Sequence, residues 1–433
     1  MAFVKIGVTD LDGVMRAKYL SEEKFEQART KGTGFCNVLF AWDLHDRLYP
    51  TGIADEGFAD ARITIDPDSR RPLPWENDVP FYLADLRDDD GPAGTACPRS
   101  LLLRTVVRAS DLGLTARFGP EYEWFAYRET PASLASRHYT APRALSPGMF
   151  GYSDLRTGQH VDYLSDLAGT LTTMGIELEG YHTETGPGAL EAALAHQEPL
   201  EAADRAIVFK QTVKQVSYRH GLLASFMAKP SADLPGCGGH LHQSVWQDDH
   251  NVFHDPDSRY GMTPLGEHYL AGQLALLPAL LPFFAPNVNS YKRYVPGSWA
   301  ATHVSWGIDN RTVALRYLPG APDSARLELR VPGADANPYL VMAAALAAGC
   351  YGIERKLPLE LPPVSGSAYA QPNGKALQTN LGGAAGELLA SGPARALFGE
   401  GFIDHFYRSR TEEWNQYQRA VTDWERQRYF ELA

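Results

Sequence analysis

Three strand-like segments carry ionisable side chains two residues apart, and this spacing constrains the fold more than any other feature of the chain. The segments are EYEW with Glu121 and Glu123, GHLH with His240 and His242, and RLELR with Arg326, Glu328 and Arg330. Residues i and i+2 of a strand point to the same face of a sheet. For any one of these segments taken alone, the alternative is a solvent-exposed sheet face without a functional site. Because Trp124 and Phe125 follow the first pair and the glycines of GCGG precede the histidines, the segments favour a buried sheet face that carries a site.

The rest of the chain predicts an α+β fold in two domains. Residues 3–100 hold short strand-like runs, FVKIGVTD, NVLFAW, ARITID and FYLADL, between turn-forming residues, and they predict a small β-rich domain. Helical spacing begins in 101–110, and later strand-like runs alternate with helix-like stretches such as EPLEAADRAIVFKQTVKQVSYRHG. We therefore expect one domain at 1–100 and a second at 101–433, which the length of the chain allows.

Composition and charge exclude several classes of protein. A net charge of −12 without a run of basic residues argues against a nucleic-acid partner. The most apolar stretch, 270–285, is shorter than the ~20 residues that span a bilayer, so no membrane segment is expected. No signal peptide is visible in MAFVKIGVTDLDG, and the four cysteines lie far apart without CxxC spacing, which predicts a cytoplasmic protein without a disulfide framework or thiolate zinc site.

Carboxylates and cations also gather in separate segments. GIELEGYHTETGPGALEAAL supplies Glu177, Glu179, Glu184 and Glu191, and the region 292–330 supplies Lys292, Arg293, Arg311, Arg316, Arg326 and Arg330. Clustered carboxylates raise one another's pKa unless a cation neutralises them, and oxygen and imidazole donors suit Mg²⁺ or Mn²⁺. Arginine forks grip carboxylates or phosphates. The alternatives are that the carboxylates lie on exposed turns and that the cations form surface salt bridges. The combination of clustered carboxylates with clustered cations favours phosphoryl chemistry. The sequence has no Walker motif and no kinase-type glycine motif, so any nucleotide site is of another kind.

Seven segments, in order along the chain, resemble those of the bacterial-type glutamine synthetases and their γ-glutamyl-amide ligase relatives. They are GPEYEWF, EGYHTETGPGALE, KPSADLPGCGGHLHQS, NSYKRYVPG, DNRTVALR, RLELR and ANPYL, and weaker similarity extends from about residue 5 to WERQRYF. The resemblance implies an N-terminal β-grasp domain and a catalytic α+β domain with a curved antiparallel sheet. It also implies a homo-oligomer, a dodecamer of two hexameric rings, in which neighbouring subunits share each active site.

The resemblance further implies a role for each matching residue. Two or more Mg²⁺ or Mn²⁺ ions would be held by Glu123, Glu184 and Glu191 and by Glu121, His240 and Glu328; glutamate by Gly236, His240, Arg293 and Arg330; and ATP by Glu179, His242, Ser244, Arg316 and Arg326. Arg311 and Arg316 would face the phosphates and act in catalysis with Glu184 and Asp43. ATP would phosphorylate the γ-carboxylate of glutamate, and an amine would displace the phosphate.

The chain departs from this family where the amine would bind. Trp299 stands where glutamine synthetases carry a loop glutamate that draws a proton from ammonium, Ala189 ends the GPGA turn, and WDLHDRLY leaves Asp43 or Asp46 as the amine-side carboxylate. A tryptophan wall favours an amine that bears an organic group. We therefore expect a γ-glutamyl-amide ligase with Tyr152, Glu184, Trp299 and one of the two aspartates near the amine.

Three alternatives stay open. Trp299 could be a loop packing residue or be misaligned, the enzyme could be an ordinary ammonia-using glutamine synthetase, or the chain could be a catalytically silent binding or assembly protein. All six matching metal positions remain Glu or His, which argues against a silent protein. The tyrosine that some bacterial members present for adenylylation has no counterpart in KALQTNLGGAAGELLAS, so this control is expected to be absent.

Overall fold

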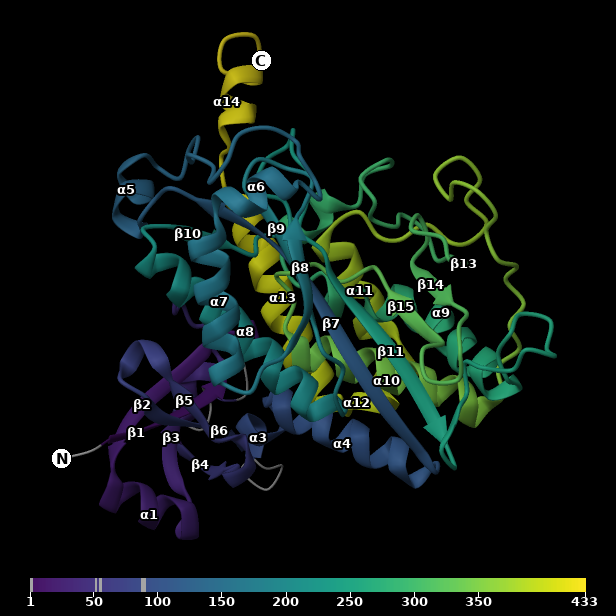
Figure 1. The fold of residues 1–433 in the computed structure, drawn as a ribbon, viewed down its shortest axis with the longest axis horizontal. Helices are drawn as coiled ribbons and strands as arrows, with labels where there is room; N and C mark the ends of the chain where they lie inside the picture. The colour runs from purple at the N-terminus through teal and green to yellow at the C-terminus, as the bar shows by residue number, and fades with distance from the viewer. Residues whose placement is uncertain (1–2, 51–52, 54–56, 87–90) are drawn as a thin grey trace.

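The N-terminal part of the chain forms a six-stranded sheet that lies at one corner of the molecule (Figure 1). The computed structural model describes all residues except 1–2, 51–52, 54–56 and 87–90. The sheet order is β2-β1-β6-β4-β3, with β5 also paired to β6; the bounds are β1 Phe3–Thr9, β2 Met15–Ser21, β3 Thr33–Cys36, β4 Asp60–Ile65, β5 Arg71–Leu73 and β6 Val79–Leu86. β1 and β2 form an antiparallel hairpin, and β1 runs parallel to β6. One apolar cluster of this part contains only residues between Val4 and Cys97.

Two local structures here differ from the sequence prediction. Helix α1 (Glu22–Lys31) follows β2, and the Ser21 side chain caps it by accepting a hydrogen bond from the Lys24 amide. The run NVLFAW, expected to be a strand, instead forms the 3₁₀ turn η1 (Asn37–Phe40), closed by the Ala41 amide donating to the Val38 carbonyl at 2.8 Å. A short continuous apolar run does not distinguish a strand from a buried turn, which is why the prediction was wrong.

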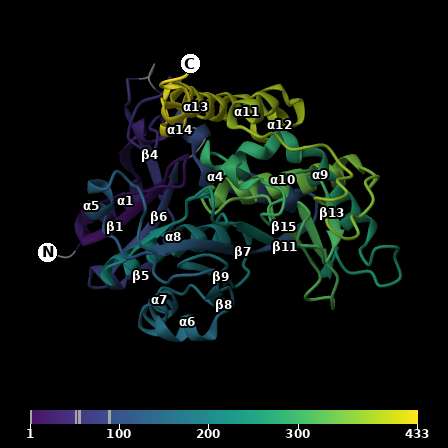
Figure 2. The ribbon, with the colours of Figure 1, turned by 90° about the horizontal axis from the view of Figure 1, so that it is seen from above.

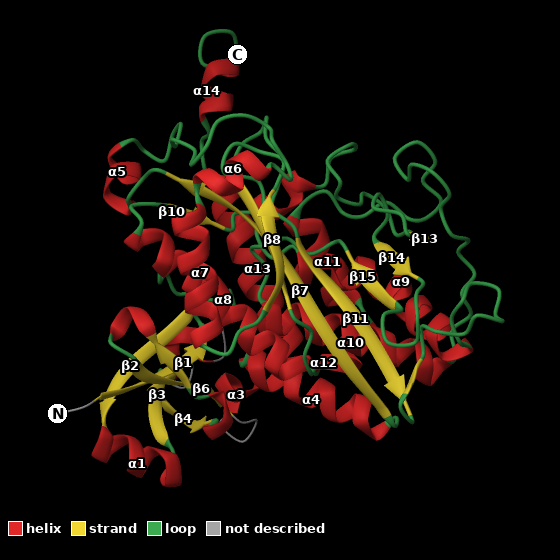
Figure 3. Cartoon of the chain, in the orientation of Figure 1, coloured by secondary structure: helices red, strands yellow, loops and turns green. Residues whose placement is uncertain are grey.

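A nine-stranded curled sheet forms the centre of the larger part (Figure 3). Its order is β13-β14-β15-β11-β7-β9-β8, with β10 also paired to β7 and β12 to β11. The bounds are β7 Leu114–Tyr127, β8 Leu178–Thr183, β9 Ala189–Leu194, β10 Leu223–Ser225, β11 Gly239–Gln247, β12 His250–Asn251, β13 Trp306–Ile308, β14 Leu315–Leu318 and β15 Arg326–Leu329. The pairs β7–β9, β11–β7 and β11–β15 are antiparallel.

Helices cover one side of this sheet in two layers, with α9 and α10 between the sheet and α11–α13 (Figure 2). The helix bounds are α3 Gly91–Ala96, α4 Pro98–Asp111, α5 Pro131–Ser136, α6 Asp154–Gln159, α7 Val161–Thr173, α8 Pro199–Arg219, α9 Pro264–Phe284, α10 Pro338–Arg355, α11 Leu381–Ala390, α12 Gly392–Phe398, α13 Glu400–Arg419 and α14 Asp423–Tyr429. α9 and α10 cross closely, because a Cβ on Gly272 would lie only 2.2 Å from the Ala348 carbonyl oxygen. The helices expected at 101–110 and in EPLEAADRAIVFKQTVKQVSYRHG are confirmed as α4 and α8.

Buried polar contacts fix the N-terminal part on the larger one. Arg99 at the start of α4 pairs with Asp85 at 2.7 Å and with Asp204 of α8 at 2.8 Å. Arg410 of α13 pairs with Asp12 at 2.6 Å in the β1–β2 turn. Because these ion pairs are largely buried, removal of one partner would leave an uncompensated charge and weaken the junction.

His405 of α13 adds a pH-sensitive contact to this junction. Its Nε2 hydrogen-bonds the Phe40 carbonyl at 2.7 Å, and burial lowers its pKa to about 4. An unfolded histidine titrates near ~6.5, so the unfolded chain binds the proton first, and stability falls as pH drops from about 6.5 to 4, by up to ~3 kcal/mol. The His405→Gln variant is expected to show a smaller loss over this range in denaturant titrations. The exposed His250→Gln control should follow the wild type, and equal slopes for His405→Gln and wild type would contradict the assignment.

Among the described residues, the structure contains no helix with the length and apolar character needed to span a membrane.

Candidate active site

The register of the large sheet brings the ionisable pairs together. β7 lies between β11 and β9, and β11 lies between β7 and β15. The residues directly opposite one another are His240 and Glu121, His242 and Glu328, and Glu191 and Glu123. Tyr122 and Trp124 alternate with the glutamates and pack on the other face against Phe209 of α8. The i, i+2 spacing therefore places one charged row on a face that the helices leave open.

One group of donors centres on Glu121. Carboxylate and imidazole atoms of Glu121, His242 and Glu328 lie within 4.8 Å of one another. His240, which the sequence prediction placed in this group, has its Nδ1 2.9 Å from Glu121 and 3.7 Å from Glu328. Burial raises the pKa of Glu121, but contacts with His240 and His242 outweigh it and hold the pKa well below its usual range. The Glu121 carboxylate is therefore ionised over the whole physiological pH range.

A second group of carboxylates lies beside the first. Glu123 accepts a hydrogen bond from the Gly238 amide at 2.7 Å, and Glu184 accepts one from the Thr185 amide at 2.9 Å. Burial raises the pKa of both carboxyl groups, and the charge of Glu191 raises them further. Such carboxylates are stabilised by a cation between them.

The space between the two groups fits a metal ion. A Cβ on Gly238 would lie 2.5 Å from Nε2 of His240 and 3.0 Å from Oε1 of Glu123, so these two donors face one small space that only glycine leaves open. The donors are carboxylate oxygens and imidazole nitrogens without a thiolate, the set that suits Mg²⁺ or Mn²⁺. The residues present therefore fit divalent metal ions.

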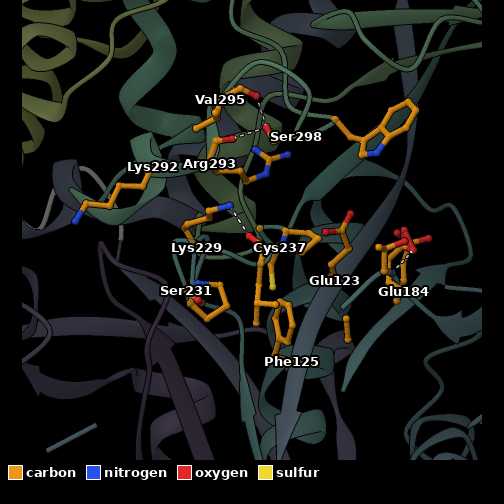
Figure 4. A pocket seen from close by; sticks show the side chains of 18 of the residues that line it. Glu123, Phe125, Glu184, Lys229, Ser231, Cys237, Lys292, Arg293, Val295 and Ser298 are labelled. Carbon is orange, nitrogen blue, oxygen red and sulfur yellow. Dashed lines mark hydrogen bonds between the residues drawn. The ribbon is translucent and has the colours of Figure 1, made fainter. Parts of the chain in front are cut away.

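A cavity of about 1120 Å³ adjoins these donors (Figure 4), and its wall contains Glu121, Glu123, Glu184, Glu191 and His240. Its wall also contains Tyr152, Gly236, Arg293, Trp299, Arg311 and Arg330. A Cβ on Gly236 would lie 2.5 Å from the Ala228 carbonyl oxygen and 2.8 Å from Cγ of Arg293, so this position also requires glycine. Arg311 forms no ion pair within the described part of the chain, which leaves its guanidinium available to an anion.

Buried arginines connect the cavity to the strands behind it. Arg293 donates to the backbone carbonyls of Val331 at 2.8 Å and of Arg330 at 3.1 Å. Glu328 accepts from Nη1 of Arg316 at 3.0 Å and from Nη1 of Arg330. Burial raises the pKa of Glu328, but Arg330 and the two histidines outweigh burial and lower it to about 2. The carboxylate of Glu328 thus fixes two guanidinium groups and stays ionised.

Comparisons with known proteins identify the family to which this chain belongs. The family model of the glutamine synthetase catalytic domain matches residues 95–429. The chain is 43% identical to type-1 glutamine synthetase 2 of Dictyostelium discoideum, over 99% of this chain and 84% of that protein. This chain belongs to the glutamine synthetase family.

The names of two other relatives refer to an organic amine or its amide. The chain is 35% identical to glutamate–isopropylamine ligase of a Pseudomonas species, over 99% of this chain and 95% of that protein. It is also 35% identical to gamma-glutamylethanolamide synthetase of Streptomyces coelicolor, over 99% of this chain and 92% of that protein. Among solved structures, the ADP complex of GmaS superposes with a TM-score of 0.86 at 29% identity and covers 99% of this chain and 97% of that chain. The chain is therefore an ATP-dependent carbon–nitrogen ligase of the glutamine synthetase family, whose members use divalent metals, glutamate and an amine or ammonia.

The residues that the resemblance assigned to ATP lie outside the cavity wall. Arg326 donates to Nδ1 of His242 at 3.1 Å, and Arg316 is held by Asp309 on one side and Glu328 on the other. The Ser244 hydroxyl accepts from Trp246 at 3.0 Å, and Glu179 is exposed on β8. These assignments stay predictions.

The structure of one chain does not bring Asp43 and Asp46 to Trp299. Asp43 accepts hydrogen bonds from the backbone amides of His45 and Arg47, and Asp46 forms an ion pair with Arg16 at 2.7 Å. Neither aspartate is in the cavity wall. A role for them at the amine requires the site of a neighbouring subunit.

Sequence reasoning missed His182 on β8. Its Nε2 lies 3.0 Å from Glu191, and this contact raises its pKa. Its ring centroid is 4.2 Å from that of Tyr152. The signal was present in the sequence, because His182 and Glu184 have the same i, i+2 spacing as the other pairs. His182 links the carboxylate group to an aromatic residue at the mouth of the cavity.

Proposed function

We propose that this enzyme joins the γ-carboxylate of glutamate to an organic amine. The observation that carries the proposal is Trp299, which lines the cavity with 62% of its surface exposed. The surrounding cavity segment, residues 295–299, contains no carboxylate. Trp299 has φ +60°, a conformation that costs a bulky residue about 1–3 kcal/mol. An exposed indole held in such a conformation at a cavity is suited to contact a ligand.

A second aromatic residue completes this mouth. Tyr152 also lines the cavity, is 68% exposed and has φ +54°. Met149 and Val295, both about half exposed, stand on the same cavity wall. Apolar side chains and aromatic faces favour an amine that bears an alkyl or aryl group over ammonium, which is small and strongly hydrated.

The cost of deprotonating the amine has to be recovered from its contacts with the site. An alkylammonium with a pKa of ~10.4 costs roughly 4.6 kcal/mol to deprotonate at pH 7, and a site without a loop carboxylate has to recover this from other contacts. An organic group supplies such contacts through buried apolar area, at about 25 cal/mol per Å². The names of two relatives, glutamate–isopropylamine ligase and gamma-glutamylethanolamide synthetase, support this proposal.

The proposed roles follow the sequence prediction. The two donor groups would hold Mg²⁺ or Mn²⁺, and His242 joins the first group, since its imidazole lies with Glu121 and Glu328. Metal ions would neutralise charge on the transferring phosphoryl oxygens. Arg293, Arg330, Gly236 and His240 would bind glutamate, Arg311 and Arg316 would stabilise the phosphates, and Glu179, His242, Ser244, Arg316 and Arg326 would surround ATP. Glu184 would accept the proton of the attacking amine.

We also propose a two-domain subunit divided near residue 100, with an N-terminal β-grasp domain. The parallel pairing of β1 with β6 and helix α1 between β2 and β3 support that topology. In a cytoplasmic dodecamer of two rings, Asp43 or Asp46 would reach the amine site of a neighbour. Burial raises the pKa of Asp43, but hydrogen bonds from the Arg47 and His45 amides outweigh burial and lower it. The carboxylate of Asp43 is therefore ionised at neutral pH, as binding of an amine would require.

An ammonia-using glutamine synthetase is the second candidate, favoured by the 43% identity to the Dictyostelium protein. Phosphate release from ATP and glutamate, measured with Mg²⁺ or Mn²⁺ against ammonia, ethanolamine, short alkylamines, polyamines and anilines, separates the two. We expect kcat/KM for at least one organic amine to exceed that for ammonia by 100-fold or more, a difference of about 2.7 kcal/mol. A preference for ammonia would refute the amine assignment, and no release with any amine would refute ligation of glutamate.

A further inference from the structure

A second cavity of about 590 Å³ lies next to the active-site cavity. The β1–β2 turn, α8, β10 and α13 form its wall, and it shares Asn289 and Lys292 with the first cavity. Figure 4 shows Lys292 extending away from Glu123 and Glu184. Three lysines line the second cavity, Lys210, Lys214 and Lys292. None of the roles described above uses this space.

The lysines of this cavity lack carboxylate partners, whereas one of its carboxylates, Asp12, is paired with an arginine outside the wall. Within the described part of the chain, no carboxylate oxygen lies within 4.0 Å of Nζ of the three lysines. Asp12 is paired with Arg410 at 2.6 Å, and Oδ2 of Asp335 accepts from the Ser290 hydroxyl at 2.6 Å. Asp335 and Glu413 form no ion pair with these lysines, so the ammonium groups of Lys214 and Lys292 remain available to an anionic ligand at their end of the cavity.

Lys210 is the most enclosed of the three amines. Its Nζ donates one hydrogen bond, to the Ala336 carbonyl at 3.2 Å. It lies 5.6 Å from the ring centroid of Tyr122 and 5.6 Å from that of Phe226. Lys210 is part of the cavity wall, and the Ala336 carbonyl is the one hydrogen-bond acceptor of its Nζ among the described residues.

The protonation of Lys210 matches this setting. Burial, together with the charge of Lys214, lowers its pKa to about 7, against a smaller opposing effect of Asp335. The other charged side chains in the cavity wall are Lys292 of η5 (Asn289–Arg293), Asp12 of the β1–β2 turn and Glu413 of α13. About half of such an amine is neutral at pH 7, compared with ~0.04% of a lysine with a pKa of ~10.4.

We propose that Lys210 is a site of acylation by small acyl phosphates that enter the second cavity. Nζ of neutral Lys210 attacks the carbonyl carbon, the new C–N bond forms as the C–O bond to phosphate breaks, and inorganic phosphate leaves with the electron pair. The nitrogen then loses one proton to solvent, and the product is an amide. Lys214 and Lys292 would attract the phosphate, and Met15 and Phe226 of the same wall would contact the acyl chain. This inference does not depend on which amine the active site uses.

Incubation of the full-length enzyme with acetyl phosphate, followed by digestion and mass spectrometry, tests the proposal. Acetylation of Lys210 should be at least about tenfold faster than that of Lys31, which is exposed at the end of α1. The advantage in neutral amine is about 10³, partly offset because a less basic nucleophile reacts more slowly, as known for thiols. The Lys210 rate should level off above about pH 8, because burial lowers the pKa of this amine to about 7.

Two comparisons make the result specific. The Lys210→Arg variant should lose this label, and the Lys214→Arg variant should retain Lys210 labelling. A neutral donor, the N-hydroxysuccinimide ester of acetic acid, should show a smaller Lys210-to-Lys31 ratio, because it lacks the phosphate. Equal rates for Lys210 and Lys31 with acetyl phosphate, or a Lys210 rate that still rises at pH 9, would overturn the proposal.

Discussion

The Glu123→Gln variant is expected to lose about 10³-fold of metal-dependent phosphate release while its metal-free form is as stable as the wild type or more stable. Glutamine keeps the carbonyl oxygen that accepts the Gly238 amide, so the local backbone is retained. Burial raises the pKa of Glu123, which means that its ionised form opposes folding in the absence of a cation. Removal of that charge should raise the free energy of unfolding by up to ~1 kcal/mol. The loss of one carboxylate ligand corresponds to about 4 kcal/mol of the activation barrier.

Two measurements separate these effects. Denaturant unfolding in a chelator gives the stability of the metal-free protein, and phosphate release over a range of Mg²⁺ concentrations gives the metal dependence. Glu177→Gln is the matched control, because Glu177 is exposed just before β8 and should leave both quantities unchanged. A Glu123→Gln enzyme with wild-type activity, or with a metal-free form destabilised by several kcal/mol, would show that Glu123 is a structural residue instead.

The shared face of the ionisable pairs was predictable because strand periodicity is local. The i, i+2 spacing of Glu121 and Glu123 predicts that both side chains point to one face of the sheet, whichever strands pair with theirs. Which strands pair is not local information. The meeting of β7 with β11 joins positions more than a hundred residues apart, and only the register shows that His240 faces Glu121. Family resemblance supplied these partners before the structure did.

The errors came from places where local signals are weak or compete. NVLFAW was predicted to be a strand but forms a 3₁₀ turn. Its continuous apolar run has no periodicity that would distinguish a strand from a buried turn. Helix α1 was missed although Ser21 caps it and Glu22 and Glu23 occupy its first turn. The placement of Asp43 beside Gln416 of α13 depends on how the chain folds back on itself, which no short motif contains.

Replacement of Trp299 by glutamate is expected to shift the enzyme from organic amines toward ammonia. Trp299 lines the cavity, and its indole is exposed to an incoming ligand. Loss of its apolar and cation–π contacts should cost an organic amine about 1–3 kcal/mol, or 10–200-fold in kcat/KM. A carboxylate in its place would draw a proton from ammonium, so the ammonia rate should rise and the organic-amine-to-ammonia ratio should fall by about 10²-fold or more.

A conservative substitution of Trp299 and a substitution of a tryptophan outside the cavity show whether the indole of Trp299 determines the preference for organic amines. Trp299→Phe keeps an aromatic face and should retain most of the preference, whereas Trp424→Glu changes an equally exposed tryptophan of α14 and should change nothing. Both Trp299→Phe and Trp299→Glu keep a side chain with a Cβ at φ +60°, so the backbone strain is matched between them. If Trp299→Glu retained the wild-type amine-to-ammonia ratio, the indole would be a packing residue of the loop, and the amine would be selected by residues of the neighbouring subunit.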